Sequence, residues 1–146
     1  MQYSFQYCIN LETIQLPSNL KYISSYLFYN CSKLQTIQLP ISLESIHDNA
    51  FHGCSSLQHI EIPPNVTFIG MEYFCNCTNL RSINLPKGLG IQSGTFKNCI
   101  NLGKIDFSGI SVISEFAFYN CTKLTFDSFP SSLTTYCSRF LIISFP

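Results

Sequence analysis

The stretch FYNCSKLQTIQLP at residues 28–40 returns as FCNCTNLRSINLP at residues 74–86. In both copies a phenylalanine, a cysteine, a leucine, an isoleucine and a proline stand at the same places. The cysteine recurs every 22 or 23 residues, at Cys8, Cys31, Cys54, Cys77, Cys99 and Cys121. Self-similarity at a period of about 20 to 50 residues is typical of a chain that winds into stacked coils.

The other apolar positions of the unit keep the same register. Phenylalanine precedes the cysteine by three residues in every copy, from Phe5 to Phe118. In a stack, equivalent residues of successive coils lie one above the next. We therefore expect a buried ladder of phenylalanines and a second one of cysteines, made of Phe28, Phe51, Phe74, Phe96 and Phe118, and of Cys31, Cys54, Cys77, Cys99 and Cys121.

The pattern L-x-x-I-x-L-P after each cysteine predicts a short strand that ends at proline. Its residues alternate around the isoleucine, as they do in a strand with one buried face. Proline ends the strand because it has no N–H to donate to a neighbouring strand. Asn or Gly, which tolerate a positive φ best, precedes the cysteine, and this predicts a left-handed turn at Asn30, Gly53, Asn76, Asn98 and Asn120.

The repeats predict one domain over residues 1–146, because a single coil buries too few side chains to fold alone. We place the repeats at about 5–27, 28–50, 51–73, 74–95, 96–117 and 118–140, followed by an irregular C-terminal tail at 141–146. The last repeat departs from the pattern. Asp127 stands where isoleucine belongs, and residues 136–140 keep no clear register.

The pattern A-F-x-x-C-x-x-L-x-x-I-x-L/I-P-x-x-V/L-x-x-I, clearest from Ala50 to Ile69, resembles the BspA-like class of leucine-rich repeats. The resemblance implies a right-handed repeat solenoid with one parallel β-sheet on its concave side. Short turns, short strands or 3₁₀ segments would form the convex side. It also implies kinship with surface proteins of bacteria and parasitic protists that take part in adhesion. A parallel β-helix is the alternative fold, and it would place strands on three faces.

The composition narrows the classes of function. Apolar residues make up 46% of the chain and charged residues 11%, which disfavours disorder. Eight basic and eight acidic side chains cancel, so no basic field attracts nucleic acid. The longest apolar run, residues 140–143, is too short for membrane insertion, and residues 1–25 lack a secretory signal. The localisation stays open: cell surface by resemblance, cytoplasm if the chain is complete.

We interpret the cysteine ladder as a row of small buried thiols. Disulfides between neighbouring coils and metal sites are the alternatives, but no C-x-x-C pair occurs. Cys75 and Cys137 stand outside the ladder and are therefore the stronger candidates for reactive thiols.

The three histidines do not complete a catalytic or metal site. His47 and His52 occupy variable positions of the return segment and are interpreted as solvated. His59 and Glu61 flank Ile60 and share one strand face, but no third partner is evident. We predict no enzyme activity, no cofactor and no metal.

The residues that flank each strand isoleucine should line one polar face. The expected ligand-binding residues on this concave face are Thr36, Gln38, His59, Glu61, Ser82, Asn84, Lys104 and Asp106. The charged end, from His59 to Asp106, is the favoured part. A solvated face without any partner is the alternative.

These observations predict a non-enzymatic scaffold that binds a protein or a glycan, with adhesion at a cell surface as the role that the resemblance implies. The alternatives are an intracellular interaction or structural module, or a fragment of a longer repeat protein. Apolar ends predict end-to-end self-association or continuation in a longer array, since exposed sheet edges recruit further strands.

Overall fold

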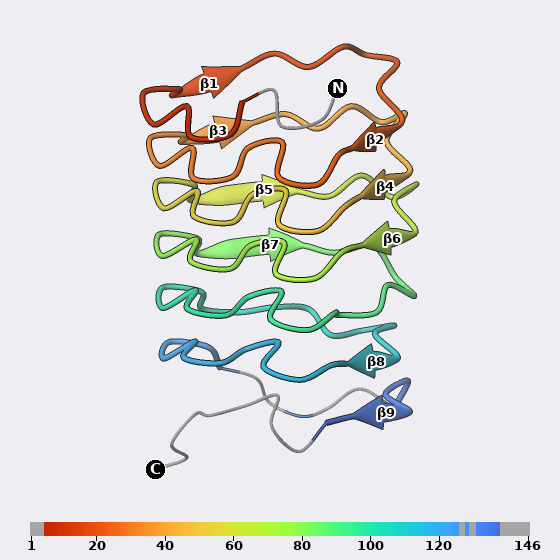
Figure 1. The fold of residues 1–146 in the computed structure, drawn as a ribbon. Coiled ribbons are helices and arrows are strands. Elements are labelled where there is room, and N and C mark those ends of the chain that lie inside the picture. The colour runs from red at the N-terminus through yellow and green to blue at the C-terminus, as the bar shows by residue number, and fades with distance from the viewer. Residues whose placement is uncertain (1–4, 126–127, 129–130, 138–146) are drawn as a thin grey trace.

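The structure is a computed structural model that describes residues 5–125, 128 and 131–137. The chain winds through coils that lie one above the next, and the strands fall into two columns (Figure 1). Asp127 and the tail at 141–146, both singled out in the sequence, lie outside the described residues. The described residues contain no helix with the length and hydropathy of a membrane span.

The first column contains the strands that the L-x-x-I-x-L-P pattern predicts. They are β1 (Thr13–Ile14), β3 (Thr36–Ile37), β5 (His59–Glu61) and β7 (Ser82–Asn84). β1 pairs with β3 and β5 with β7, and isolated bridges from Ser82 to Lys104 and from Lys104 to Thr125 continue the column. All of these pairings are parallel, which confirms the expected strand direction.

A second column of strands lies opposite the first and agrees with the short strands that are among the elements expected outside the concave sheet. Its members are β2 (Tyr22–Ile23), β4 (Ser45–Ile46), β6 (Phe68–Ile69), β8 (Val112–Ile113) and β9 (Thr135–Tyr136). The return segment also alternates around an isoleucine, so it pairs with its neighbours as the first strand does. Among the described residues, strands therefore occupy two sides of each coil.

The strand β9 keeps the repeat register at Tyr136, the first residue of the stretch 136–140 for which the sequence predicts no clear register, whereas residues 138–140 lie outside the described residues. Tyr136 pairs with Ile113, so the repeat spacing is kept up to this residue. A tyrosine occupies the place of the inward isoleucine here, and it is 63% exposed. The sequence pattern failed because it relies on apolar side chains, whereas the backbone pairing does not depend on them.

The predicted left-handed turns are confirmed. The five residues before the cysteines have φ between 57° and 73°, at Asn30, Gly53, Asn76, Asn98 and Asn120. A second left-handed series, which the sequence did not reveal, runs through Tyr26, Asn49, Glu72, Gly94 and Phe116. Its members share no residue type, and a non-glycine residue in this region costs roughly 1–2 kcal/mol.

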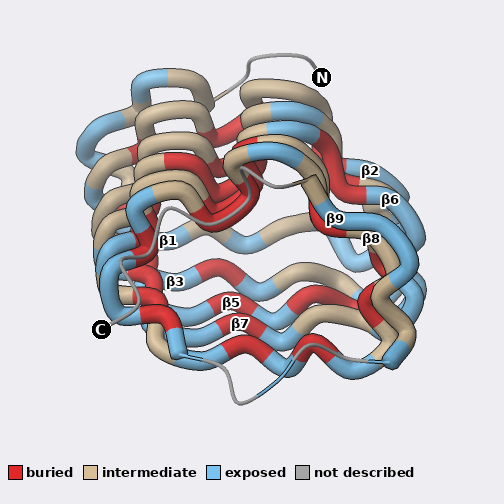
Figure 2. Tube along the Cα trace, turned by 90° about the horizontal axis from the view of Figure 1, so that it is seen from below, coloured by how far each residue is buried: buried red, intermediate tan, exposed pale blue. Residues whose placement is uncertain are grey.

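Stacked phenylalanine rings form the middle of the core. The ring centroids of Phe28 and Phe51 lie 5.1 Å apart, and those of Phe51 and Phe74 lie 5.9 Å apart. The series continues to Phe96 and Phe118 at 5.7 and 5.4 Å. Buried segments recur at similar places in successive coils (Figure 2), beginning at Ile23 in the first described coils. The apolar area that no single coil can hide is thus buried between coils.

The cysteine ladder runs beside the phenylalanine ladder, and its thiol groups donate hydrogen bonds to the backbone carbonyls of the phenylalanines. Each ladder thiol donates a hydrogen bond to the phenylalanine carbonyl of the preceding coil, at 3.0–3.2 Å. The same carbonyl also accepts the backbone N–H of the cysteine in its own coil, as Phe51 does from Cys54. Cysteine is small enough for this corner and still carries a weak donor, which alanine lacks.

Candidate functional site

The face of the first strand column is polar and exposed. All eight predicted site residues are exposed: Thr36, Gln38, His59, Glu61, Ser82, Asn84, Lys104 and Asp106. The pairing of β5 with β7 places His59 beside Ser82 and Glu61 beside Asn84. The alternation of the strand explains this arrangement, because the isoleucine between the two polar residues points into the core.

Three of these residues, His59, Ser82 and Asp106, take part in side-chain hydrogen bonds. The Nδ1 atom of His59 lies 2.9 Å from the Ser82 hydroxyl. The Asp106 carboxylate accepts bonds from the backbone N–H of Ser108 at 2.8 Å and from its hydroxyl at 2.9 Å. These bonds, the backbone one first, lower the pKa of Asp106. Asp106 is therefore engaged within its own turn at the charged end of the face.

A hollow of about 730 Å³ lies over the first coils of the same face. Thr36, Gln38 and Glu61 line it, together with Thr13, Gln15 and the proline turns that follow β3 and β5. The other five predicted residues are not among those that line it. Its size falls within the range of small-ligand sites, roughly 300–1,000 Å³. The hollow thus lies toward the neutral end of the face, away from the end that the sequence favoured.

Exposed aromatic side chains lie on the second column, outside the residues that the sequence predicts to bind a ligand. Tyr22 on β2 is 53% exposed and Phe68 on β6 is 46% exposed. The His47 ring lies between them, with centroid distances of 6.3 Å to Tyr22 and 5.9 Å to Phe68. The signal was present in the sequence, since Tyr22 and Phe68 directly precede the inward isoleucines of the return segment.

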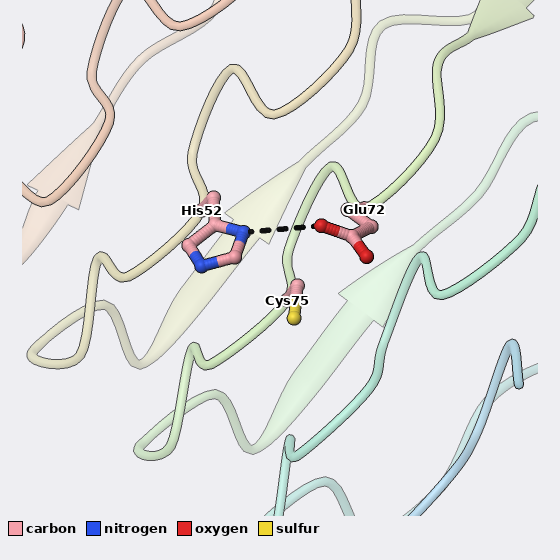
Figure 3. Close-up of side chains that lie close together, drawn as sticks. All are labelled: His52, Glu72 and Cys75. Carbon is pink, nitrogen blue, oxygen red and sulfur yellow. Dashed lines mark ion pairs between the residues drawn. The ribbon is translucent and has the colours of Figure 1, made fainter.

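A third feature joins His52, Glu72 and Cys75 on the turn side of two neighbouring coils (Figure 3). One ligand atom from each of the three residues lies within 4.8 Å of the others. The His52 ring stacks on Tyr29 at 4.7 Å, and its side chain is only 15% exposed. The interpretation of His52 as a solvated residue is therefore wrong, because stacking on the coil above covers the ring. Burial, the largest influence, lowers the His52 pKa.

Cys75 also differs from its expected role as a reactive thiol. The residue is buried, at 3% exposure, and burial raises the pKa of its thiol to about 11. The nearby Glu72 carboxylate raises it further, while Lys97 opposes this effect. The thiolate is the reactive form of cysteine, so a buried thiol with a raised pKa is a poor nucleophile.

We expect a maleimide reagent to label Cys137 and Cys8 of the native protein before it labels Cys75 or Cys77. Cys8 and Cys137 are half-buried, whereas the other two are buried. In denaturant nearly all eight cysteines should react, because we expect free thiols. Peptide mass spectrometry at timed intervals measures both results. Native labelling of Cys77 as fast as Cys137, or four disulfides in the unfolded chain, would contradict this expectation.

Comparison with known proteins gives a family and a set of structural relatives. A family model described as a BspA type leucine rich repeat region matches residues 1–125 in six copies. No curated protein matches the chain. A leucine-rich repeat protein from Bacteroides ovatus is 29% identical, with a TM-score of 0.70 over 93% of this chain. One from Eubacterium ventriosum is 25% identical, with a TM-score of 0.74 over 92% of this chain.

A third solved structure is that of a leucine rich cell surface protein from Faecalibacterium prausnitzii. It is 23% identical, and this chain aligns over 92% of its own length and 43% of that protein, with a TM-score of 0.62. The chain covers 42% of the Bacteroides ovatus protein and 44% of the Eubacterium ventriosum protein. It therefore spans less than half the length of these relatives.

Proposed function

Because this chain belongs to the family of BspA-type leucine-rich repeat proteins, we propose that it is a non-enzymatic scaffold whose first strand column binds a protein or a glycan. In this proposal the chain is a repeat solenoid, and the column of β1, β3, β5 and β7 lies on its concave side. Repeat arrays use such extended faces for binding.

The hollow over β1 and β3 is the observation that carries this proposal. Short uncharged side chains line much of it, with Thr13, Gln15, Thr36 and Gln38 offering hydroxyl and amide groups. These groups can donate and accept hydrogen bonds, as a hydroxyl-rich sugar or an extended peptide requires. The Glu61 carboxylate adds one acceptor at the edge of the hollow.

The one arrangement on this face that bears on catalysis is the contact between His59 and Ser82 among the described residues. Ser82 and His59 form an exposed pair that resembles a nucleophile and its base. Within the described part of the chain, however, no carboxylate accepts a hydrogen bond from His59. A serine nucleophile needs a base that a third group orients.

A role at a cell surface is also a proposal. One structural relative is called a cell surface protein, but at 23% identity it shares only the fold. The many cysteines do not argue for the inside of a cell, because burial raises the pKa of the ladder thiols, to about 11 for Cys31 and about 12 for Cys121. Such thiols resist oxidation. An intracellular interaction module remains the alternative prediction.

End-to-end self-association remains a proposal as well. Phe5, Cys8, Leu11 and Ile14 in the first described coil are only half-buried, whereas their equivalents one coil later are buried. A second copy of the chain, or further repeats, could cover these side chains. Light scattering at rising concentration tests the first case, and a constant monomer mass would refute it.

We expect a glycan array and a panel of immobilised extracellular-matrix proteins to identify a ligand whose binding Thr36→Arg abolishes. Thr36 is exposed on β3 and lines the hollow, so the long arginine side chain should fill the space without disturbing the core. Surface changes of this kind usually alter stability by about 0.5 kcal/mol or less. Biolayer interferometry of each hit against the parent and the variant provides the measurement.

The matched controls separate the hollow from the other exposed surfaces. Lys104→Ala tests the charged end of the same face, and Phe68→Ser tests the aromatic stripe of the second column. Both should leave binding within about twofold, well below the tenfold that corresponds to 1.4 kcal/mol. Loss of binding in Phe68→Ser with retention in Thr36→Arg would overturn the assignment to the hollow. Failure of every probe to bind would count against the binding role itself.

A further inference from the structure

We propose that His52, Glu72 and Cys75 form a zinc-binding site with three protein ligands and one position left for water. The three residues supply a nitrogen, an oxygen and a sulfur ligand, which is a combination that Zn²⁺ accepts in tetrahedral sites. The site lies on the turn side of the coils and does not share residues with the proposed binding face. The two proposals are therefore independent.

The repeat itself brings the ligands together. His52 and Cys75 hold equivalent positions in successive coils, 23 residues apart, so stacking places one beside the other. The backbone ties their turns, because the N–H of Gly53 donates to the Cys75 carbonyl at 2.8 Å. Glu72 adopts φ 49°, a left-handed conformation that a glutamate rarely takes. The equivalent residues of other coils, such as Asn49 and Phe116, share this conformation, so the turn that presents Glu72 is part of the repeat.

The distances are close to those of a bound ion. In a tetrahedral zinc site, ligand atoms lie about 3.3–3.6 Å apart, as the metal–ligand bond lengths require. The His52 Nδ1 atom is already 3.7 Å from a Glu72 carboxylate oxygen, and no pair in the cluster exceeds 4.8 Å. The largest separation exceeds the tetrahedral spacing by about 1 Å, which a small rotation of the side chains can close. The Glu72 side chain is 43% exposed, so an ion can enter from solvent.

The buried Nδ1 atom of His52 is a second, independent pointer to a ligand. It is shielded from solvent and has no hydrogen-bond partner among the described residues. The 3.7 Å separation from Glu72 is too long for a hydrogen bond. A buried polar atom without a partner is costly, and coordination to a metal would remove that cost.

The other ring nitrogen contacts an amide ladder that can be flipped to suit a metal-bound histidine. In the structure the Asn76 amide NH2 donates to Nε2 at 3.1 Å, and the NH2 groups of Asn98 and Asn120 donate in turn to the amide oxygens of Asn76 and Asn98 at 2.7 and 3.1 Å. Each amide carries both a donor and an acceptor, so the ladder can run in either direction with the same number of bonds. In the reversed direction, Nε2–H donates to Asn76 and frees the Nδ1 lone pair for zinc. Such outer partners orient histidine ligands.

The charges of the ligands also suit a divalent ion. The Glu72 carboxylate and a Cys75 thiolate together carry two negative charges, which balance those of Zn²⁺. Binding displaces the Cys75 proton to solvent, because the metal ligand is the thiolate. Lys97 holds the position equivalent to His52 and Cys75 in the next coil. Its ammonium lies 5.8 Å from the centroid of the Tyr119 ring.

Titration of the reduced protein with Co²⁺, followed by displacement with Zn²⁺, tests the site by absorption spectroscopy. We expect one ion per chain and a thiolate-to-cobalt charge-transfer band, which Cys75→Ser removes. His52→Phe keeps the ring stacked on Tyr29 and should weaken binding more than about tenfold. Asn76→Gly tolerates the left-handed φ, as Gly53 does one coil earlier, and should weaken binding about 10–100-fold.

The controls are His59→Gln and Cys137→Ser, which remove a histidine and a thiol outside the cluster and should leave the titration unchanged. Circular dichroism of every variant confirms that the fold is retained. Any one of three results would overturn the proposal: no charge-transfer band in the parent, a band that persists in Cys75→Ser, or an equal loss of the band in Cys137→Ser.

Discussion

Phe51→Ala should lower the free energy of unfolding by about 3–5 kcal/mol. The ring is fully buried between Phe28 and Phe74, and Tyr73 meets it edge-on at a centroid distance of 5.4 Å. Truncation removes these contacts from two coil interfaces at once and leaves a cavity that the flanking rings cannot fill. Chemical denaturation followed by circular dichroism measures the loss.

Phe68→Ala is the matched control, because it removes the same atoms from the surface. Phe68 is 46% exposed on β6, and its ring contact is with His47 at 5.9 Å. We expect a loss of at most about 1 kcal/mol, the usual range of a cross-strand pair. Equal denaturation midpoints for the two variants would show that the phenylalanine ladder does not hold the coils together. If Phe51→Ala does not fold, Phe51→Leu should show the same direction with a smaller loss.

Gly70→Ala should destabilise the protein by about 1–3 kcal/mol, the range for overpacking. A Cβ atom at Gly70 would clash with an Asp48 carboxylate oxygen, and it would lie 2.5 Å from the Asp48 nitrogen and 2.7 Å from the His47 carbonyl carbon. Two of these are backbone atoms, so a change of rotamer cannot relieve the clash. Gly70 does not have a positive φ, and the effect is therefore steric.

Gly103→Ala, the same chemical change at another position, should stabilise the protein instead. A Cβ atom there would meet only the Arg81 carbonyl oxygen, at 3.8 Å, and Gly103 also lacks a positive φ. Replacing such a glycine usually stabilises a protein by about 0.4–1 kcal/mol, because the unfolded chain loses freedom. The difference in thermal midpoint between the two variants measures the effect. Similar midpoints would mean that the coils can separate at Gly70 without cost.

The sequence predicted most of the fold because the repeat makes each coil a copy of the last. The inward positions of Phe51, Cys54, Leu57 and Ile60 were evident from their spacing, and all are buried. The left-handed turn before each cysteine followed from Asn and Gly. The second left-handed turn did not, since Glu72 and Phe116 are not residues that favour it. Backbone pairing with the adjacent coils holds them there, as Glu72 N–H donates to the Ser93 carbonyl.

The candidate sites were harder to predict than the fold. The outward positions of the first column, such as Thr36 and Glu61, could be named from alternation alone. The position of the hollow on this face could not be predicted, because it depends on how the proline turns are placed beside the strands. The cluster of His52, Glu72 and Cys75 was missed for a related reason. Its members occupy variable positions, and a pattern search discards such positions as surface.

The sequence by itself determined which side chains face inward and that equivalent residues stack, because a period of 22 or 23 residues fixes both once coils lie on coils. Only the tertiary structure decided which side chains the variable residues contact. His52 and Cys75 are one coil apart, and their contact depends on the height of the coil and on the direction of each turn. Periodicity selects the residues of the core, whereas the neighbours of a variable residue depend on the backbone of two coils at once.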